Sequence, residues 1–125
     1  MTFLESLKFN EKGLIPAIIQ DQKSGKVLTL CYMTREAIEK SLQEKKIYVF
    51  RRSKGRLMLK GETSGHIQVI KSLSIDCEGN SLLFIVDQHV AGCHAGYFTC
   101  YYRTVTGTGT LEITDTTVFD PKETY

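Results

Sequence analysis

The stretch Thr34–Lys46, which reads TREAIEKSLQEKK, decides the fold class because it carries the clearest helix pattern of the chain. Thr34 is a favourable N-cap residue, and Glu36 lies in the first turn, where the helix dipole stabilises an acidic side chain. One face at helical spacing carries Ala37, Ile38, Ser41 and Leu42. We therefore predict one main helix over about residues 34–45, with its apolar face against a sheet.

Runs rich in β-branched and aromatic residues lie on both sides of this helix and predict strands. Before them, Met1–Lys12 predicts one or two helical turns. The predicted strands are Leu14–Gln20, Val27–Met33, Ile47–Ser53, Arg56–Lys60, His66–Ile75, Ser81–Val86, Thr99–Thr106 and Thr110–Val118. In the turn Cys77–Asn80, glycine and asparagine suit a positive φ. The chain is thus expected to form a single strand-rich α+β domain over residues 1–125, with a mostly antiparallel sheet.

The composition narrows the range of functions. The formal net charge is only +2, which gives little reason to expect a nucleic-acid partner. There is no run of about eighteen apolar residues and no charged-then-apolar leader, so we expect no membrane span, no secretory signal and a cytoplasmic location. In that reducing compartment, the four cysteines are expected to be metal ligands or core residues rather than disulfides.

Three of the four cysteines lie between Cys77 and Cys100. Thiolates bind zinc strongly, but Cys77, Cys93 and Cys100 are separated by fifteen and six residues, too far apart for a local zinc knuckle. Tertiary or quaternary contacts must bring them together, which suits a catalytic zinc with three protein ligands and one open position. The alternative is that they are ordinary buried thiols. Cys31, in a predicted strand, is expected to pack in the core.

Two further features point to chemistry. His94 directly follows Cys93, and neighbouring residues of an extended strand point to opposite faces, so His94 is a better candidate for a general acid or base than for a second ligand. Lys60–Gly65, which reads KGETSG, has glycines, hydroxyls and a cation that could bind a phosphate. On composition alone, a polar turn is the favoured interpretation of that segment.

Taken together and in this order, these motifs closely resemble the phosphoribosyl-AMP cyclohydrolase family of histidine biosynthesis. The resemblance covers roughly residues 13–103 and rests on Arg52-Ser53, Lys60–Gly65 with Gln68, Asp76-Cys77, Cys93-His94 and Cys100. It implies a hydrolase that opens the adenine ring of 1-(5-phosphoribosyl)-AMP between N1 and C6 with a zinc-activated water. Three thiolates leave such a zinc site negatively charged, so a nearby base is needed, and His94 is our candidate for this catalytic role.

The resemblance also implies a homodimer that shares its metal sites. Each zinc, one per subunit, would be bound by Cys93 and Cys100 of one subunit and by Cys77 of the other. A magnesium cluster, usually Asp-Cys-Asp-x-Asp, would fall on Asp76, Glu78 and Asn80, which offer hard oxygen ligands. The last two depart from the family pattern, and the neutral amide removes one charge, so we expect weaker magnesium binding.

The implied substrate, phosphoribosyl-AMP, carries two phosphates. The positions expected to bind it are Arg52, Ser53, Lys60, Glu62, Thr63 and Ser64. We expect a monofunctional protein, because the chain leaves no room for the pyrophosphohydrolase domain that some family members carry. The threonine-rich tail, Thr104–Tyr125, is expected to form edge strands and dimer contacts.

Two other functions stay open at this stage. A zinc-dependent base deaminase uses similar water chemistry, but its His-x-Glu and Pro-Cys-x-x-Cys signature is absent. A non-catalytic, zinc-stabilised nucleotide-binding module would need a fourth protein ligand in place of the open position, and Cys31 or His94 would have to supply it.

Overall fold

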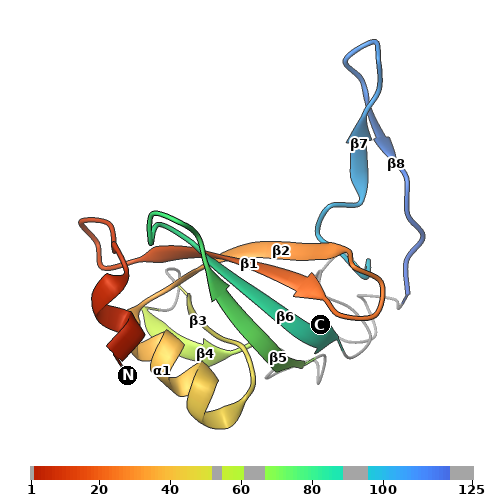
Figure 1. The fold of residues 1–125 in the computed structure, drawn as a ribbon. Coiled ribbons are helices and arrows are strands. Elements are labelled where there is room, and N and C mark those ends of the chain that lie inside the picture. Colours follow the sequence, from red (N-terminus) through yellow and green to blue (C-terminus); the bar gives the residue numbers. More distant parts are fainter. Residues whose placement is uncertain (1, 52–54, 61–66, 89–95, 119–125) are drawn as a thin grey trace.

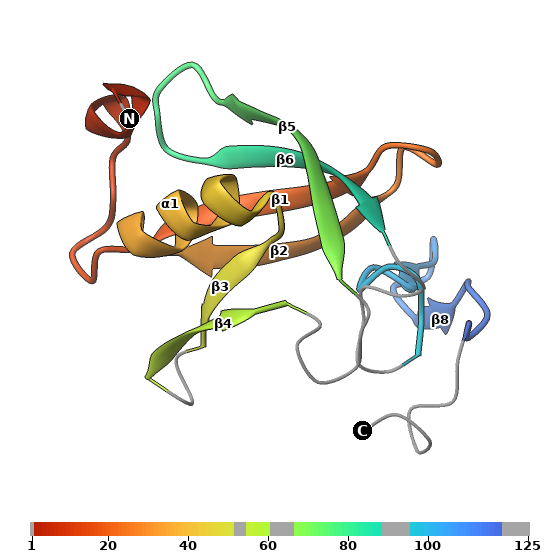
Figure 2. The same cartoon turned by 90° about the horizontal axis from the view of Figure 1, so that it is seen from below.

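A computed structural model describes residues 2–51, 55–60, 67–88 and 96–118 of the chain (Figure 1). Its elements in chain order are a 3-10 helix η1 (Thr2–Ser6), β1 (Ile15–Asp21), β2 (Val27–Met33), α1 (Arg35–Glu44), β3 (Tyr48–Arg51), β4 (Arg56–Leu59), β5 (Gln68–Ile75), β6 (Leu82–Gln88), β7 (Arg103–Val105) and β8 (Leu111–Ile113). Four strands form one sheet in the order β2-β1-β6-β5, and α1 covers one face of it (Figure 2). Two hairpins, β3–β4 and β7–β8, complete the fold.

The helix α1 forms where the sequence predicts it. The Thr34 side chain accepts a hydrogen bond from the Ala37 N–H at 3.1 Å, and Lys45 ends the helix in the left-handed conformation. Ser41 is buried, and its Oγ accepts a hydrogen bond from the Tyr48 N–H at 2.9 Å. The helix is therefore fastened to the start of β3 as well as packed on the sheet.

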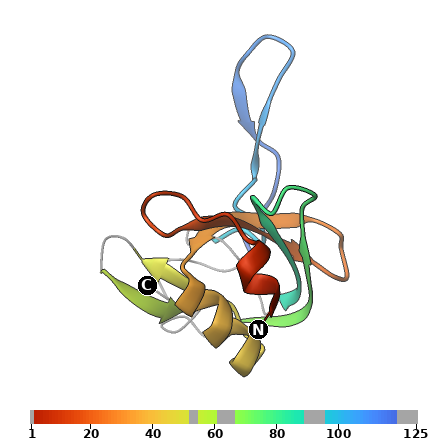
Figure 3. The ribbon, with the colours of Figure 1, turned by 60° about the vertical axis from the view of Figure 1, so that its left-hand side comes forward.

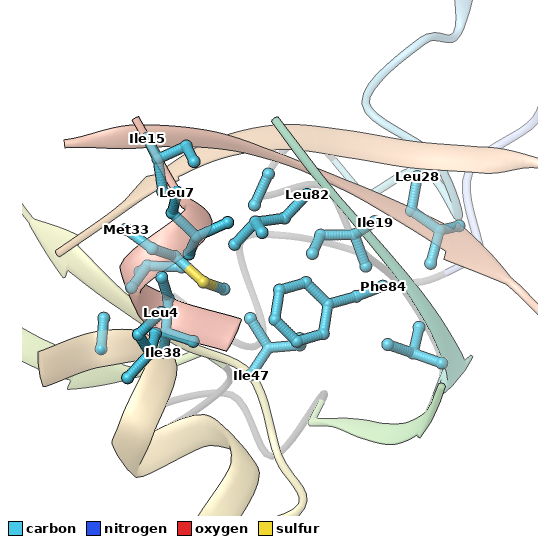
Figure 4. Packing of buried hydrophobic residues seen from close by; sticks show 14 residues of the cluster. Leu4, Leu7, Ile15, Ile19, Leu28, Met33, Ile38, Ile47, Leu82 and Phe84 are labelled. Carbon is cyan, nitrogen blue, oxygen red and sulfur yellow. The ribbon is translucent and has the colours of Figure 1, made fainter. Parts of the chain in front are cut away.

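The core lies between α1 and the central strands of the sheet (Figure 4). Burial alternates along β1 and β6, so that Ile19 of β1 and Phe84 of β6 point inward while their sequence neighbours point outward. Strand β1 pairs with β2 in antiparallel and with β6 in parallel orientation, and β6 pairs with β5 in antiparallel orientation. The predicted α+β class with one main helix and mainly antiparallel pairing is thus confirmed.

The structure corrects four local predictions. The strands predicted at Thr99–Thr106 and Thr110–Val118 shorten to the three-residue strands β7 and β8. Thr99 and Cys100 instead dock on β2, because the Thr99 hydroxyl donates to the Val27 carbonyl at 2.6 Å. Only the first part of the predicted N-terminal helix forms, as η1. In the turn before β6, Gly79 has a positive φ but Asn80 does not.

Other predicted elements are confirmed to within a few residues of their ends. Within the described ranges, no helix has both the length and the apolar character needed to cross a membrane.

Cys31 is half-buried and packs against the core, which confirms its expected packing role. It lies on β2 opposite Ala17, with its Sγ 3.7 Å from the Ala17 carbonyl oxygen, and it contacts the buried cluster. Burial raises the pKa of the Cys31 thiol to about 12; the Cys100 thiol also raises this pKa, and the Lys60 ammonium opposes the shift. The thiol is therefore protonated, and unreactive, at neutral pH.

Truncation of Phe84 tests the core. Phe84→Ala should lower the free energy of unfolding by about 3–5 kcal/mol, because it removes a fully buried ring and leaves a cavity. Urea unfolding followed by circular dichroism measures the loss. Ser72→Ala, at an exposed position on β5, is the matched control and should change stability by less than about 0.5 kcal/mol. Similar losses for both variants would contradict the assignment of the core.

The raised pKa of Cys31 predicts selective labelling of the thiols. At pH 8, iodoacetamide should modify exposed Cys77 and spare Cys31 in the native, metal-free protein, whereas both should react after denaturation. Peptide mass spectrometry identifies the labelled sites. Between pH 9 and about 12 the unfolded chain loses this proton before the folded chain does, so stability should fall as pH rises. Rapid native labelling of Cys31 would contradict its burial.

Candidate active site

One end of the sheet gathers several of the predicted site residues. We call it the loop end and define it by Lys60, Gln68, Gln88 and Cys100. Gln68, the first residue of β5, pairs directly with Gln88, the last residue of β6. The chain segments that precede Gln68 and follow Gln88 therefore join the sheet at neighbouring positions.

These two segments contain other candidates, which lie outside the described residues. They are Glu62, Thr63 and Ser64 before β5, and Cys93 and His94 after β6. Arg52 and Ser53, which follow β3, also lie outside the described residues.

Lys60 reaches the loop end through backbone contacts. Its N–H donates to the Ile47 carbonyl at 2.9 Å, and the Ile47 N–H donates to the Gln68 carbonyl at 3.2 Å. The charge of Lys60 also acts on the thiol of Cys31 in β2. Lys60 is thus held beside the start of β5, where a cation can bind an anionic group.

Cys100 lies beside the start of β2. Its N–H donates to the Leu28 carbonyl at 2.7 Å, and the neighbouring Thr99 hydroxyl is buried against the same strand. Beyond it, the rings of Tyr97 and Tyr102 stack with their centroids 3.8 Å apart. This stacked pair fixes the path of the chain on either side of Cys100.

Sequence reasoning missed a pair of buried amides at the loop end. Gln68 Nε2 donates to Gln88 Oε1 at 2.6 Å, while Gln68 Oε1 and Gln88 Nε2 have no hydrogen-bond partner among the residues that the structure describes. Leaving a buried polar atom without a partner costs about 1–3 kcal/mol, so the pair calls for an explanation. A polar ligand bound at the loop end would provide one. The available indication in the sequence was glutamine at both positions where apolar strands meet the candidate segments.

The opposite end of the sheet carries the acidic cluster. We call it the turn end and define it by Asp76–Asn80, between β5 and β6. Asp76 Oδ1 accepts hydrogen bonds from the N–H groups of Asn80 at 2.6 Å and Ser81 at 3.1 Å. Asn80 Nδ2 donates to Glu78 Oε2 at 3.3 Å. The side chains of Asp76, Cys77, Glu78 and Asn80 are all exposed.

The N-terminal segment packs directly behind this turn. The Lys8 N–H donates to the Gly79 carbonyl at 2.8 Å. Gly79 has φ +72°, and a Cβ built on it would collide with the Ser6 carbonyl oxygen. Only glycine fits this close approach without displacing one of the two backbones.

The donor atoms at the turn end are of the type that binds a hard cation. Their arrangement suits such a cation less well. Two carboxylates and one amide offer oxygen ligands of the kind that magnesium binds. However, one oxygen of Asp76 already accepts two backbone hydrogen bonds. Among the described parts of the chain, no three Cys, His, Asp or Glu side chains lie close enough together to hold one metal ion. The magnesium site stays a prediction.

A single chain does not bring Cys77 and Cys100 together, because the β5–β6 turn and the segment that precedes β7 lie at different ends of the sheet (Figure 1). At the turn end, Ile75, Leu82 and Ala17 lie side by side in one row across three strands, and Cys77 lies beyond this row. Cys100 donates a hydrogen bond to Leu28, next to Val27, which lies in the same row as Gln20. Three residues of strand separate these rows, which is roughly 10 Å, and the strands between add roughly 10 Å more. Two thiolates on one zinc lie within about 5 Å of each other. One zinc can therefore bind both residues only if they come from different copies.

Comparison with known proteins places the chain in a family. The sequence model of phosphoribosyl-AMP cyclohydrolase matches residues 29–102. The chain is 45% identical over 124 residues to the phosphoribosyl-AMP cyclohydrolase of Chlorobium phaeovibrioides, covering 99% of this chain and 90% of that protein. It is 47% identical over 122 residues to the histidine biosynthesis bifunctional protein HisIE of Thermoanaerobacter pseudethanolicus, covering 98% of this chain and 56% of that protein. The chain therefore belongs to the phosphoribosyl-AMP cyclohydrolase family.

Proposed function

We propose that this protein is a phosphoribosyl-AMP cyclohydrolase of histidine biosynthesis, which hydrolyses the N1–C6 bond of the adenine ring of 1-(5-phosphoribosyl)-AMP. The observation that carries the proposal is the near-full-length identity with relatives of that name. The grouping of Lys60, Gln68 and Cys100 at the loop end supports it, because these residues lie beside the segments that hold the other motif residues.

The proposed zinc ligands are Cys93 and Cys100 of one copy and Cys77 of a second copy. Their thiolates suit zinc, and the distance between Cys77 and Cys100 within one chain supports a site built from two copies. When bound, zinc lowers the pKa of a coordinated water and so supplies a nucleophile near neutral pH. The oxygen ligands of Asp76, Glu78 and Asn80 would hold magnesium, more weakly than a cluster with a third carboxylate.

The chain's own residues would orient the substrate and move its protons. His94 would accept a proton from the attacking water, since histidine is the side chain whose unperturbed pKa lies near neutrality. Lys60, with Arg52, Ser53, Glu62, Thr63 and Ser64, would bind the phosphates and sugars of the substrate. The substituent on N1 makes the ring cationic, so C6 is already electrophilic when water attacks.

Replacement of His94 separates this function from a non-catalytic, zinc-stabilised binding module. Metal-stripped wild-type protein should gain turnover of phosphoribosyl-AMP with zinc, and further with magnesium if the turn end binds it. His94→Asn should lower turnover about 100-fold or more and keep its zinc, because it removes a base and not a ligand. Gln43→Ala, exposed on α1, is the control and should match wild type. Loss of zinc or of the fold in His94→Asn would favour the binding module.

Mixing two inactive variants tests whether the zinc site is shared. Cys77→Ser and Cys100→Ser should each fail to bind zinc tightly. After unfolding and refolding together, half of the dimers contain both variants, and each has one intact site, so about a quarter of the wild-type zinc binding and turnover should return. Bound zinc is measured after gel filtration.

The matched control mixes Cys93→Ser with Cys100→Ser. These two ligands come from the same copy, so every mixed site lacks one of them and no binding should return. Equal recovery in both mixtures, or none in the first, would contradict a site shared in this way.

A further inference from the structure

The row of inward-facing side chains along β6 ends in a polar residue. Leu82, Phe84 and Val86 are buried. Gln88 follows them on the same face, because side chains two residues apart in a strand point the same way. This face of the sheet carries α1 and the β3–β4 hairpin, which both lie on the side away from the β7–β8 hairpin (Figure 3). The apolar core thus ends, at the loop end, in an amide.

Gln68 lies opposite Gln88, at a position where an apolar side chain would extend the core. It exposes none of its surface, and its carbonyl accepts a hydrogen bond from the Ile47 N–H at 3.2 Å. Its Nε2 donates to Gln88 Oε1 at 2.6 Å. Within the described ranges, Gln68 Oε1 and Gln88 Nε2 are buried without a hydrogen-bond partner. The pair therefore has one spare acceptor and one spare donor.

The two amides fix each other's orientation. If Gln68 alone turned over, its Oε1 would face Gln88 Oε1, and the hydrogen bond between them would be lost. Turning both amides over restores the bond and again leaves one donor and one acceptor, now exchanged. The pair therefore suits a group that offers both a donor and an acceptor. It disfavours a group that offers two acceptors, such as a phosphate dianion, because one amide oxygen would stay unpaired.

A buried carboxylate holds Gln88 in place. Asp21, the last residue of β1, exposes 4% of its surface. Its carboxylate accepts hydrogen bonds from the backbone N–H groups of Ser24, at 2.8 Å, and of Gln88. Asp21 also pairs with Val86 in the parallel ladder between β1 and β6. These contacts fix the backbone at the end of β6, so the spare amide groups are held at the edge of the core.

We propose that Gln68 and Gln88 bind the N6–N7 edge of the substrate's adenine ring, with N6–H donating to Gln68 Oε1 and Gln88 Nε2 donating to N7. A glutamine amide recognises this edge of adenine with the same two kinds of atom. In phosphoribosyl-AMP, the second sugar is attached to N1 and blocks the other edge of the ring. The inference rests on the proposed function, which supplies the substrate, and deepens it by assigning the residues that recognise the base.

The surroundings of the pair agree with this assignment. The Lys60 N–H donates to the Ile47 carbonyl, and the Ile47 N–H donates to the Gln68 carbonyl, so a cation lies near the amides. A phosphate and a base of one nucleotide could thus be bound by neighbouring groups of matching chemistry. The row behind the pair is apolar, so a ligand reaches the amides from beyond the strand ends. A base enclosed there has no water to replace a lost hydrogen bond, which makes the recognition selective.

The amide pair is expected to serve binding rather than stability. Replacing both partners of a buried hydrogen bond by apolar groups of similar shape is close to neutral or stabilising. The double variant Gln68→Met with Gln88→Met should therefore keep or raise the melting temperature and bind phosphoribosyl-AMP about 100-fold more weakly, because two hydrogen bonds to the base are lost. Gln43→Met, at an exposed position on α1, is the matched control and should change neither quantity.

Calorimetry with two ligands tests the assignment to N7. Metal-free, full-length protein is titrated with phosphoribosyl-AMP and with its 7-deaza analogue, so that the ligand is not consumed. In wild type, replacing N7 by CH should weaken binding about 10-fold or more, because Gln88 Nε2 is left buried and unpaired. In Gln88→Met, the same replacement should change the Kd by less than about 2-fold, because the donor is already absent.

Three results would overturn the assignment. They are equal losses with the 7-deaza analogue in wild type and Gln88→Met, unchanged binding by the folded double variant, and no binding by metal-free wild type. The first is expected if the amides hold only an ordered water. If the double variant fails to fold, the two ligands compared in Gln88→Met still decide. Binding as predicted, without turnover by the zinc-loaded protein, would count against the proposed function alone.

Discussion

Burial of the inward-facing side chains of β1 and β6 is the constraint on which the rest of the structure depends. These two strands are far apart in sequence, and their parallel pairing places Ile19 beside Phe84 under α1. The helix and the β3–β4 hairpin return the chain to this core, and β5 adds to its edge. Because the interior is close-packed, the strands cannot slide past each other, and the loop end and the turn end of the sheet stay apart.

The rigidity of this sheet divides the candidate chemistry between its two ends. The loop end holds Lys60, Gln68 and Cys100, and the turn end holds Asp76 and Cys77. A site that combines the two ends within one chain would require the sheet to fold over. In the proposed dimer, each site combines the loop end of one copy with the turn end of the other. Activity would then depend on protein concentration wherever the dimer dissociates.

The sequence was enough to predict the helix and most strands, because these depend on local patterns. Thr34 marks the start of α1, and runs rich in apolar and β-branched residues mark β1 and β6. The parallel pairing of β1 with β6 was not predicted, since such a run identifies a strand and not its neighbour. Thr99 has strong strand propensity, yet its hydroxyl bonds to β2 and the strand starts only at Arg103.

The candidate site was predictable in its residue types and not in its geometry. Thiolates suggest zinc wherever they occur, so Cys77 and Cys100 could be chosen from the sequence. Their positions at opposite ends of the sheet follow from strand pairing, which the residue types do not reveal. The buried pair Gln68 and Gln88 was missed as a pair for the same reason, because its two members meet only across the ladder.

The close approach of Gly79 to Ser6 links two regions that differ greatly in their freedom to change. Segments near a chain terminus usually tolerate substitution, whereas a glycine with positive φ that packs against a second backbone does not. Here the backbone of the N-terminal segment forms the back wall of the acidic turn. Because both sides of this contact are backbone atoms, a side chain added at Gly79 would displace the N-terminal segment as well as the turn, whereas side-chain changes at Ser6 would leave the contact in place.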